Sequence, residues 1–150
     1  MSSKIEKISH YGIVVIAVAA VVVSFWQVRI LQDHNKLSVR PLMDFHLGTS
    51  VDSVLSVSIS NRGIGPAIIQ DISYIYQDSV YKELGLVLIR ADLQDDVKRV
   101  VGYGKNTVFS PNTEFTILRI GSRDNKRIGI SVRIIYQSIY EEEFEMNLSF

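Results

Sequence analysis

The chain has 150 residues with 16 basic and 16 acidic side chains, so its formal net charge is zero. This balance excludes a strong overall attraction to nucleic acid, and we expect no nucleic acid polymer among its partners. The chain lacks cysteine, which excludes disulfides, thiolate catalysis and cysteine-based metal sites.

The N-terminal part contains 21 consecutive residues, 8–28, without a formally charged side chain. At a helical rise of about 1.5 Å per residue this stretch covers about 30 Å, the thickness of the hydrocarbon core of a bilayer. We therefore expect a short tail over residues 1–10 and a transmembrane helix over residues 11–28, with the lipid bilayer as a partner. Tyr11 and Trp26 lie near its two ends, where amphipathic rings favour the headgroup region.

A cleavable signal peptide is the alternative, because Lys4 and Lys7 precede the apolar run and residues 17–19 resemble a small-residue cleavage site. The run continues to Phe25 and Trp26, however, so cleavage there would leave half of it on the mature protein. A retained anchor is the favoured interpretation. Basic residues are nearly balanced on the two sides of the run, which leaves the side of the membrane open.

The residues after the apolar run are compatible with a helix, so we expect a helical juxtamembrane stalk over residues 29–40. Pro41 ends it, because the residue before a proline is pushed toward extended geometry. Residues 41–150 are then the soluble domain, about 110 residues with one modest core.

Beyond Pro41 apolar and polar residues alternate, which is the period of half-buried strands. The alternation covers Met43 to Leu47 and Leu55 to Ile59, and residues 66–77 and 113–120 supply two further strands. The clearest pattern is a C-terminal hairpin with its turn over residues 138–142. Its expected inward residues are Ile128, Ile130, Val132, Ile134 and Tyr136, then Phe144, Met146, Leu148 and Phe150.

One segment between the strands has helical spacing. Apolar residues recur at steps of three and four at Leu86, Ile89, Leu93, Val97 and Val100. This spacing predicts a helix with those residues on its buried face, ended by the glycines at positions 102 and 104. The whole pattern predicts an immunoglobulin-like antiparallel β-sandwich of about six or seven strands with one inserted helix.

The sharpest local motif is Asn-Arg-Gly-Ile-Gly-Pro-Ala-Ile-Ile over residues 61–69. Glycine and asparagine at a strand end favour a tight turn, and Pro66 can open the next strand because its first residue need not donate to the ladder. A dinucleotide-binding G-x-G-x-x-G motif is excluded, because Ile68 stands where the third glycine belongs.

This motif, the apolar run with Trp26, the stretch from Asp33 to Pro41 and the stretch from Ile134 to Tyr140 together resemble a known group. The group consists of small bacterial membrane-anchored proteins with an immunoglobulin-like domain, most of them uncharacterised. The resemblance covers most of the chain through motifs that are architectural. It implies a β-sandwich and a location in the bacterial envelope, where we expect the inner membrane, and it provides no catalytic residues.

Two glycine-containing basic segments are the candidate ligand-binding residues. The first contributes Lys98, Arg99, Tyr103 and Lys105, and the second contributes Arg119, Arg123, Lys126 and Arg127. Flexible backbone amides with Lys and Arg could hold the phosphate groups of an anionic small molecule such as a nucleotide second messenger, and Tyr103 could stack on a base. The alternative is solvated loop charge, partly neutralised by neighbouring aspartates. A Walker A motif is excluded around Lys105, because its first glycine is missing and Asn follows the lysine.

The remaining polar motifs favour no chemistry, and we expect no metal and no cofactor. Residues 141–143 are three glutamates in the hairpin turn, where solvated charge is favoured over a weak cation site or a docking patch for a basic partner. His10, His34 and His46 lack zinc-ligand spacing. No nucleophile elbow, metalloprotease motif or paired carboxylates are present, so no catalytic residue is predicted.

Two functional hypotheses follow. The first is a membrane-anchored, non-enzymatic interaction or scaffold module that binds another membrane protein or a second copy, through an exposed strand edge or through small residues of the span. The alternative is a cytosol-facing sensor or effector in bacterial defence or signalling. In that hypothesis the basic segments bind an anionic ligand and the response passes to an oligomeric transmembrane segment.

Overall fold

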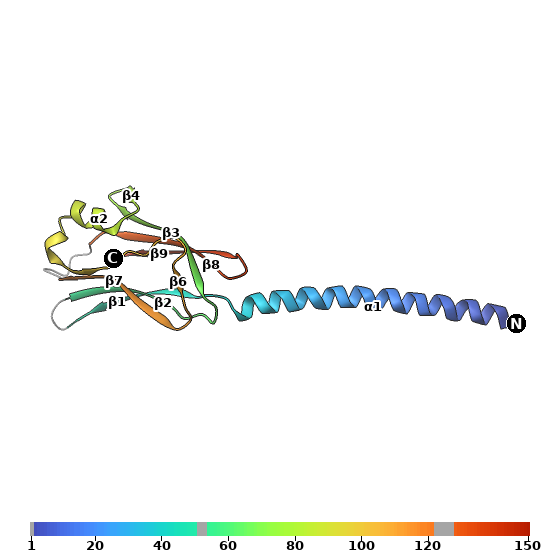
Figure 1. Ribbon diagram of the computed structural model, residues 1–150. Coiled ribbons are helices and arrows are strands. Elements are labelled where there is room, and N and C mark those ends of the chain that lie inside the picture. The colour runs from blue at the N-terminus through green and yellow to red at the C-terminus, as the bar shows by residue number, and fades with distance from the viewer. Residues whose placement is uncertain (1, 51–53, 122–127) are drawn as a thin grey trace. The chain divides into compact units, whose positions relative to one another are not determined.

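The computed structural model describes residues 2–50, 54–121 and 128–150, with side chains from Tyr11 onward. The chain divides into two compact units, residues 1–38 and residues 39–150 (Figure 1). The first unit is the helix α1 (Ser2–Ser38), and the second contains all of the described strands.

α1 contains a 28-residue stretch, Tyr11–Ser38, that is long and apolar enough to cross a membrane. Its large apolar side chains are exposed, Phe25 and Trp26 among them. The helix continues without a break through most of the expected stalk and ends at Ser38, whose Oγ donates a hydrogen bond to the Asn35 carbonyl oxygen. An N-terminal apolar helix is therefore confirmed.

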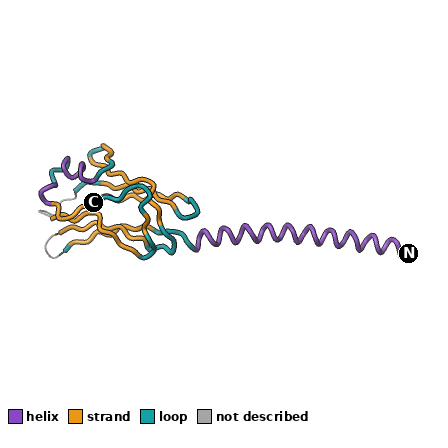
Figure 2. Tube along the Cα trace, in the orientation of Figure 1, coloured by secondary structure: helices purple, strands orange, loops and turns teal. Residues whose placement is uncertain are grey.

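The second unit consists of two antiparallel sheets (Figure 2). Sheet A has the strand order β1 (Met43–Thr49), β2 (Val54–Asn61), β7 (Thr113–Gly121) and β5 (Val97–Val100). Sheet B has the order β4 (Ser79–Tyr81), β3 (Ala67–Tyr76), β8 (Ser131–Gln137) and β9 (Glu143–Ser149), and β6 (Val108–Phe109) also pairs with β3.

This strand order is that of an immunoglobulin-like sandwich. Sheet A follows the A-B-E-D order, and sheet B follows C-F-G with a short additional strand beside strand C. The predicted fold class is therefore confirmed. The described residues contain nine strands, more than the sequence pattern showed, because β4 and β6 are three and two residues long and too short to display a period.

The core lies between the two sheets and is apolar. It is formed by inward residues of the central strands, all 8% exposed or less: Val57, Ile59, Ile69, Ile72, Leu118, Ile120, Val132 and Ile134. Because the chain has no cysteine, apolar burial holds the sheets together where antibody domains also have a disulfide.

The C-terminal hairpin is also confirmed. β8 and β9 pair with Ile134 opposite Met146 and Tyr136 opposite Phe144, and these two rings stack with centroids 5.4 Å apart. In the turn, Ser138 is fully buried and its Oγ accepts hydrogen bonds from the amides of Tyr140 and Glu142.

The predicted inserted helix is present, but its length and its buried face were wrong. α2 spans only Leu84–Arg90, a 3-10 turn, η1, follows at Gln94–Asp96, and residues 97–100 form strand β5. The buried residues of α2 are Leu84, Val87 and Leu88, whereas Leu86 and Ile89 are 50% and 61% exposed. The Val-rich segment 97–101 forms an edge strand because it pairs with β7, so tertiary pairing overrides the helical spacing.

The helix also ends earlier than the glycines at 102 and 104. Asp92 has a φ of 55°, the Asp92 amide donates to the Ile89 carbonyl, and the Leu93 amide donates to the Leu88 carbonyl. These two bonds are the Schellman motif, which usually has glycine at the left-handed position. Because aspartate occupies that position, the sequence did not show the helix end.

Candidate functional site

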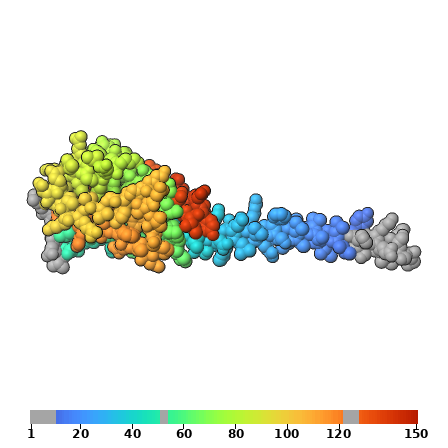
Figure 3. Space-filling model, in the orientation of Figure 1, coloured from blue at the N-terminus to red at the C-terminus, as the bar shows by residue number. Residues whose placement is uncertain are grey.

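Two arginines stand directly opposite each other at the β5 edge of sheet A. In the antiparallel pairing of β5 with β7, Arg99 is the partner of Arg119, and both side chains are exposed. Opposite residues on one face have Cβ atoms about 4.5–5.5 Å apart, a distance at which like charges repel. These arginines were expected in two separate basic segments of the chain. They lie instead on neighbouring strands, and the surfaces of these two segments adjoin in yellow and orange in Figure 3.

Lys98 adds a third positive charge beside the pair. The ladder of β5 and β7 shifts register between Val97 and Arg99, so Lys98 sits in an irregularity of the edge strand. Its Cε lies 3.8 Å from the position that a Cβ on Gly121 would occupy, so the side chain runs along that glycine. We call Lys98, Arg99 and Arg119 the cationic edge.

Tyr103 lies close to the cationic edge but is held by aromatic packing. Its ring makes edge-on contacts with Phe109 and Phe115, with centroid distances of 5.2 and 5.8 Å. Burial raises the pKa of the Tyr103 hydroxyl, and the nearby charge of Arg99 offsets part of this rise. Because two rings already pack against it, Tyr103 has less ring surface for stacking on a base than the sequence alone indicated.

None of the ion pairs that join two described residues includes Lys98, Arg99 or Arg119. These ion pairs join Arg62 to Asp44, Lys82 to Asp71 and Arg133 to Glu145. All three lie on other parts of the sandwich. The closest acidic groups along the chain are Asp95 and Asp96, in the turn that precedes β5. Three cations on adjoining strand positions make this edge a favourable place for an anion.

Of the other predicted binding residues, the structure describes only Lys105, and it lies away from this edge. Lys105 lies in a turn whose next residue, Asn106, donates its amide to the Ile69 carbonyl of sheet B. Lys105 therefore belongs to the other sheet. Arg123, Lys126 and Arg127 lie outside the described residues. Of the two predicted basic segments, Lys98, Arg99, Tyr103 and Arg119 thus converge.

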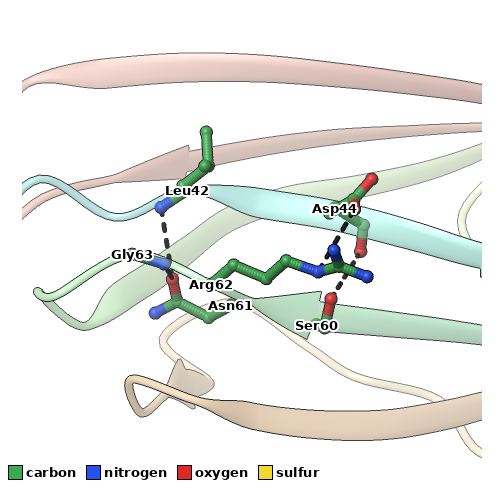
Figure 4. A network of polar contacts seen from close by, with 6 residues as sticks. All are labelled: Leu42, Asp44, Ser60, Asn61, Arg62 and Gly63. Atoms are coloured by element: carbon green, nitrogen blue, oxygen red, sulfur yellow. Dashed lines mark hydrogen bonds and ion pairs between the residues drawn. The ribbon is translucent and has the colours of Figure 1, made fainter.

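The turn at residues 61–66 is structural. Asn61 is fully buried, and its Oδ1 accepts hydrogen bonds from the amides of Leu42 and Gly63 at 3.2 and 3.0 Å (Figure 4). Its Nδ2 donates to the carbonyls of Gly65 and Phe109 at 2.8 and 3.0 Å. All four hydrogen-bonding positions of the amide are filled, so this side chain joins β2, β6 and the first residues of the domain.

The glycines of this turn are required by close packing. A Cβ on Gly63 would lie 2.3 Å from the Leu42 nitrogen, and one on Gly65 would lie 1.6 Å from the Val39 oxygen. Residues 39–42 therefore run directly over the turn. Arg40 also lies over the Phe144 ring, with its Cζ 4.6 Å from the centroid. The most distinctive motif in the sequence, residues 61–69, thus holds the first residues of the domain against the sandwich.

Two further sets of candidates are not gathered into a site. Glu141 has a φ of 61° in the β8–β9 turn, where the neighbouring Glu143 is exposed, and His46 is exposed on β1. Within the described ranges no group of three or more His, Asp or Glu side chains is placed to hold a metal ion. The cationic edge remains the strongest candidate for binding, and only the strand register revealed it.

The chain matches no protein-family model and no curated protein. The fold defines an apolar N-terminal helix joined to an immunoglobulin-like β-sandwich.

Proposed function

We propose that this chain is a membrane-anchored, non-enzymatic interaction module of the bacterial inner membrane. The observation that carries the proposal is an apolar helix with exposed side chains, followed at once by a folded β-sandwich. Exposed apolar surface on this scale suits hydrocarbon and not water. Immunoglobulin-like sandwiches serve many unrelated functions, so the fold itself assigns no activity.

The sandwich offers strand edges as the means of interaction. β9 is a seven-residue edge strand, Glu143–Ser149, that pairs on one side with β8 and contains no proline. Its other side carries backbone donors and acceptors that can pair with an added strand. The partner is a second copy or another membrane protein that presents an extended segment.

Membrane insertion is tested first, because it separates an anchor from a signal peptide. We expect the full chain to stay in the membrane fraction after alkaline carbonate extraction and to keep the mass of the uncleaved protein. Release into the supernatant, or loss of residues 1–19, would overturn the anchor.

Topology is tested by labelling single cysteines with a membrane-impermeant maleimide in intact cells. Val80→Cys is suited to this, because Val80 is 64% exposed, and Val57→Cys is the control because Val57 is fully buried. Labelling of position 80 in intact cells would place the domain outside the cytosol, and labelling only after lysis would place it inside. Crosslinking in native membranes then tests the interaction, and a ladder with monomers alone would contradict it.

The cationic edge favours a second candidate function, a cytosol-facing sensor of an anionic ligand. Arg99 and Arg119 are register partners, an arrangement that is unfavourable for like charges, so an anion that pairs with both would offset it and gain charge-assisted hydrogen bonds. A nucleotide second messenger has phosphates of the required charge.

This candidate is tested by titrating the full chain in detergent micelles with pyrophosphate and with a panel of cyclic nucleotides. Arg99→Gln and Arg119→Gln should each weaken binding by about tenfold, the loss expected for one charge-assisted hydrogen bond. Arg133→Gln is the matched control, since Arg133 lies on sheet B and pairs with Glu145. Equal affinity in all three variants would exclude the cationic edge as the site.

A further inference from the structure

One end of the sandwich carries exposed apolar side chains from three separate segments. We call it the proximal end, because it is where residue 39 begins the domain. Its exposed residues are Ile64 at 74%, Leu42 at 59%, Ile139 at 50% and Tyr140 at 43%. Apolar side chains that gather on one surface, in contrast to ones scattered singly, mark an interaction site.

The strand registers place these segments at the same end. Ile68, near the start of β3, pairs with Gln137, the last residue of β8, so the turn before β3 and the turn after β8 are neighbours. Leu42 joins them, because its carbonyl accepts a hydrogen bond from the Arg62 amide. Figure 1 shows the β8–β9 turn and the loop before β3 at the same end of the domain.

The proximal end is also tied closely to α1 along the chain. Ser38 is the last helical residue, and the next residue, Val39, already packs on Gly65 within the sandwich. From Asp33, the first acidic residue after the apolar run, to Ser38 the helix rises only about 7.5 Å. The headgroup layer on each side of a bilayer is about 5–7 Å thick, and Arg29 can extend its charge into that layer from below.

We propose that the proximal end is a bilayer-contacting surface, with Leu42, Ile64, Ile139 and Tyr140 in the headgroup region. This inference rests on the proposed anchor. Apolar contact drives the binding to the bilayer, because the charges at this end are of both signs. Arg40 and Arg62 are positive, and Asp44 and the glutamates at 141–143 are negative. Tyrosine suits the site, since its ring prefers the boundary between water and hydrocarbon.

The opposite end of the sandwich provides a matched comparison. β4 pairs with the last residues of β3, so β4 and the following helix α2 lie at the far end. Val80 and Ile89 are 64% and 61% exposed there, which is as exposed as the proximal residues. A bilayer contact must distinguish the two ends, whereas general surface exposure would not.

The test measures depth with nitroxide labels on single cysteines, which the cysteine-free chain permits. Ile64→Cys and Ile139→Cys report on two segments of the proximal end, Val80→Cys and Ile89→Cys report on the far end, and Val18→Cys reports on the anchor. The full chain is placed in phosphatidylcholine nanodiscs, and collision of each label with oxygen and with a water-soluble nickel complex is measured. We expect an oxygen-to-nickel ratio at 64 and 139 several-fold above that at 80 and 89.

Each other outcome has a definite meaning. Water-like ratios at 64 and 139 with a lipid-like ratio at 18 would overturn the bilayer contact and leave the anchor intact. A water-like ratio at 18 would overturn the anchor itself. Label–label broadening at 64 that disappears on dilution with unlabelled chain would show a second copy covering this end, which also overturns the proposal. Two labelled segments are used so that a fold disturbed by one label does not decide the result.

Discussion

The turn at residues 61–66 and the cationic edge differ in how completely their polar groups are paired. At the turn, Asn61 fills all four hydrogen-bonding positions and Gly65 leaves no room for a side chain. At the edge, Arg99 and Arg119 oppose each other, and neither takes part in an ion pair with another described residue. A cluster whose hydrogen bonds are all made stabilises the fold. A cluster of like charges destabilises it, and a ligand of opposite charge gains free energy by removing that repulsion. The more distinctive motif in the sequence is thus the structural one.

The largest expected effect is a difference in stability between alanine substitutions at two glycines. Gly65→Ala places a Cβ into the Val39 carbonyl and should lower the free energy of unfolding by about 3 kcal/mol or more. Gly85→Ala in α2 meets nothing within 4 Å and should be neutral or stabilising by up to about 1 kcal/mol. Urea unfolding of the full chain in micelles, followed by circular dichroism of the sheets, measures both. Tolerance of Gly65→Ala would show that residues 39–42 are not fixed on the turn.

A similar loss is expected when the buried amide is removed. Asn61→Ala leaves buried backbone groups of Gly63, Gly65 and Phe109 without this partner and should cost about 3 kcal/mol. Asn147→Ala is the control, because Asn147 is exposed on β9 and should change stability by less than about 0.5 kcal/mol. Equal effects of the two substitutions would contradict a stabilising role specific to the turn.

The cationic edge should respond in the opposite direction. Arg119→Thr removes the like-charge contact with Arg99 and should raise the free energy of unfolding by about 0.5 kcal/mol at low salt. The gain should shrink in 1 M salt, where the Debye length is only about 3 Å. Arg133→Thr removes an attractive contact with Glu145 instead, so it should not stabilise the domain. A destabilising Arg119→Thr would show that the arginine is already satisfied.

The smallest expected effect is a shift in one titration. Arg99 lowers the pKa of Tyr103 because its positive charge favours the phenolate, so Arg99→Gln should raise that pKa further above the ordinary value. Phenolate absorbance, with Tyr103→Phe subtracted to isolate the residue, measures the shift. An anion bound to Arg99 should raise the same pKa, which makes Tyr103 a reporter for the site. No change in Arg99→Gln would place the guanidinium away from Tyr103.

The fold was predictable from the sequence to the extent that its patterns are local. The period of two along β8 and β9 identified the hairpin, since side chains alternate between core and solvent along any strand. The end of α2 was not predictable, because Asp92 takes the left-handed conformation usually given to glycine. Residues 97–100 were assigned to the helix for a related reason: Val97 and Val100 suit either spacing, and only pairing with β7 decides between them.

The candidate site was predictable only in its residue types. Lys98, Arg99 and Arg119 were identified as cations, but their meeting depends on the register between strands about twenty residues apart. Tyr103 was expected to face a ligand, yet it packs on Phe109 and Phe115, which lie later in the chain. No local pattern encodes either contact.

The sequence by itself determined an apolar helix of membrane-spanning length and a domain of half-buried strands, because spacing and hydropathy act over a few residues. Tertiary structure decided which strands are neighbours. That choice made the turn at Asn61 a structural junction, set Arg99 against Arg119 and gathered exposed apolar residues at the proximal end. The physical reason is that strand pairing joins distant segments by backbone hydrogen bonds and core packing, which no short stretch of sequence specifies.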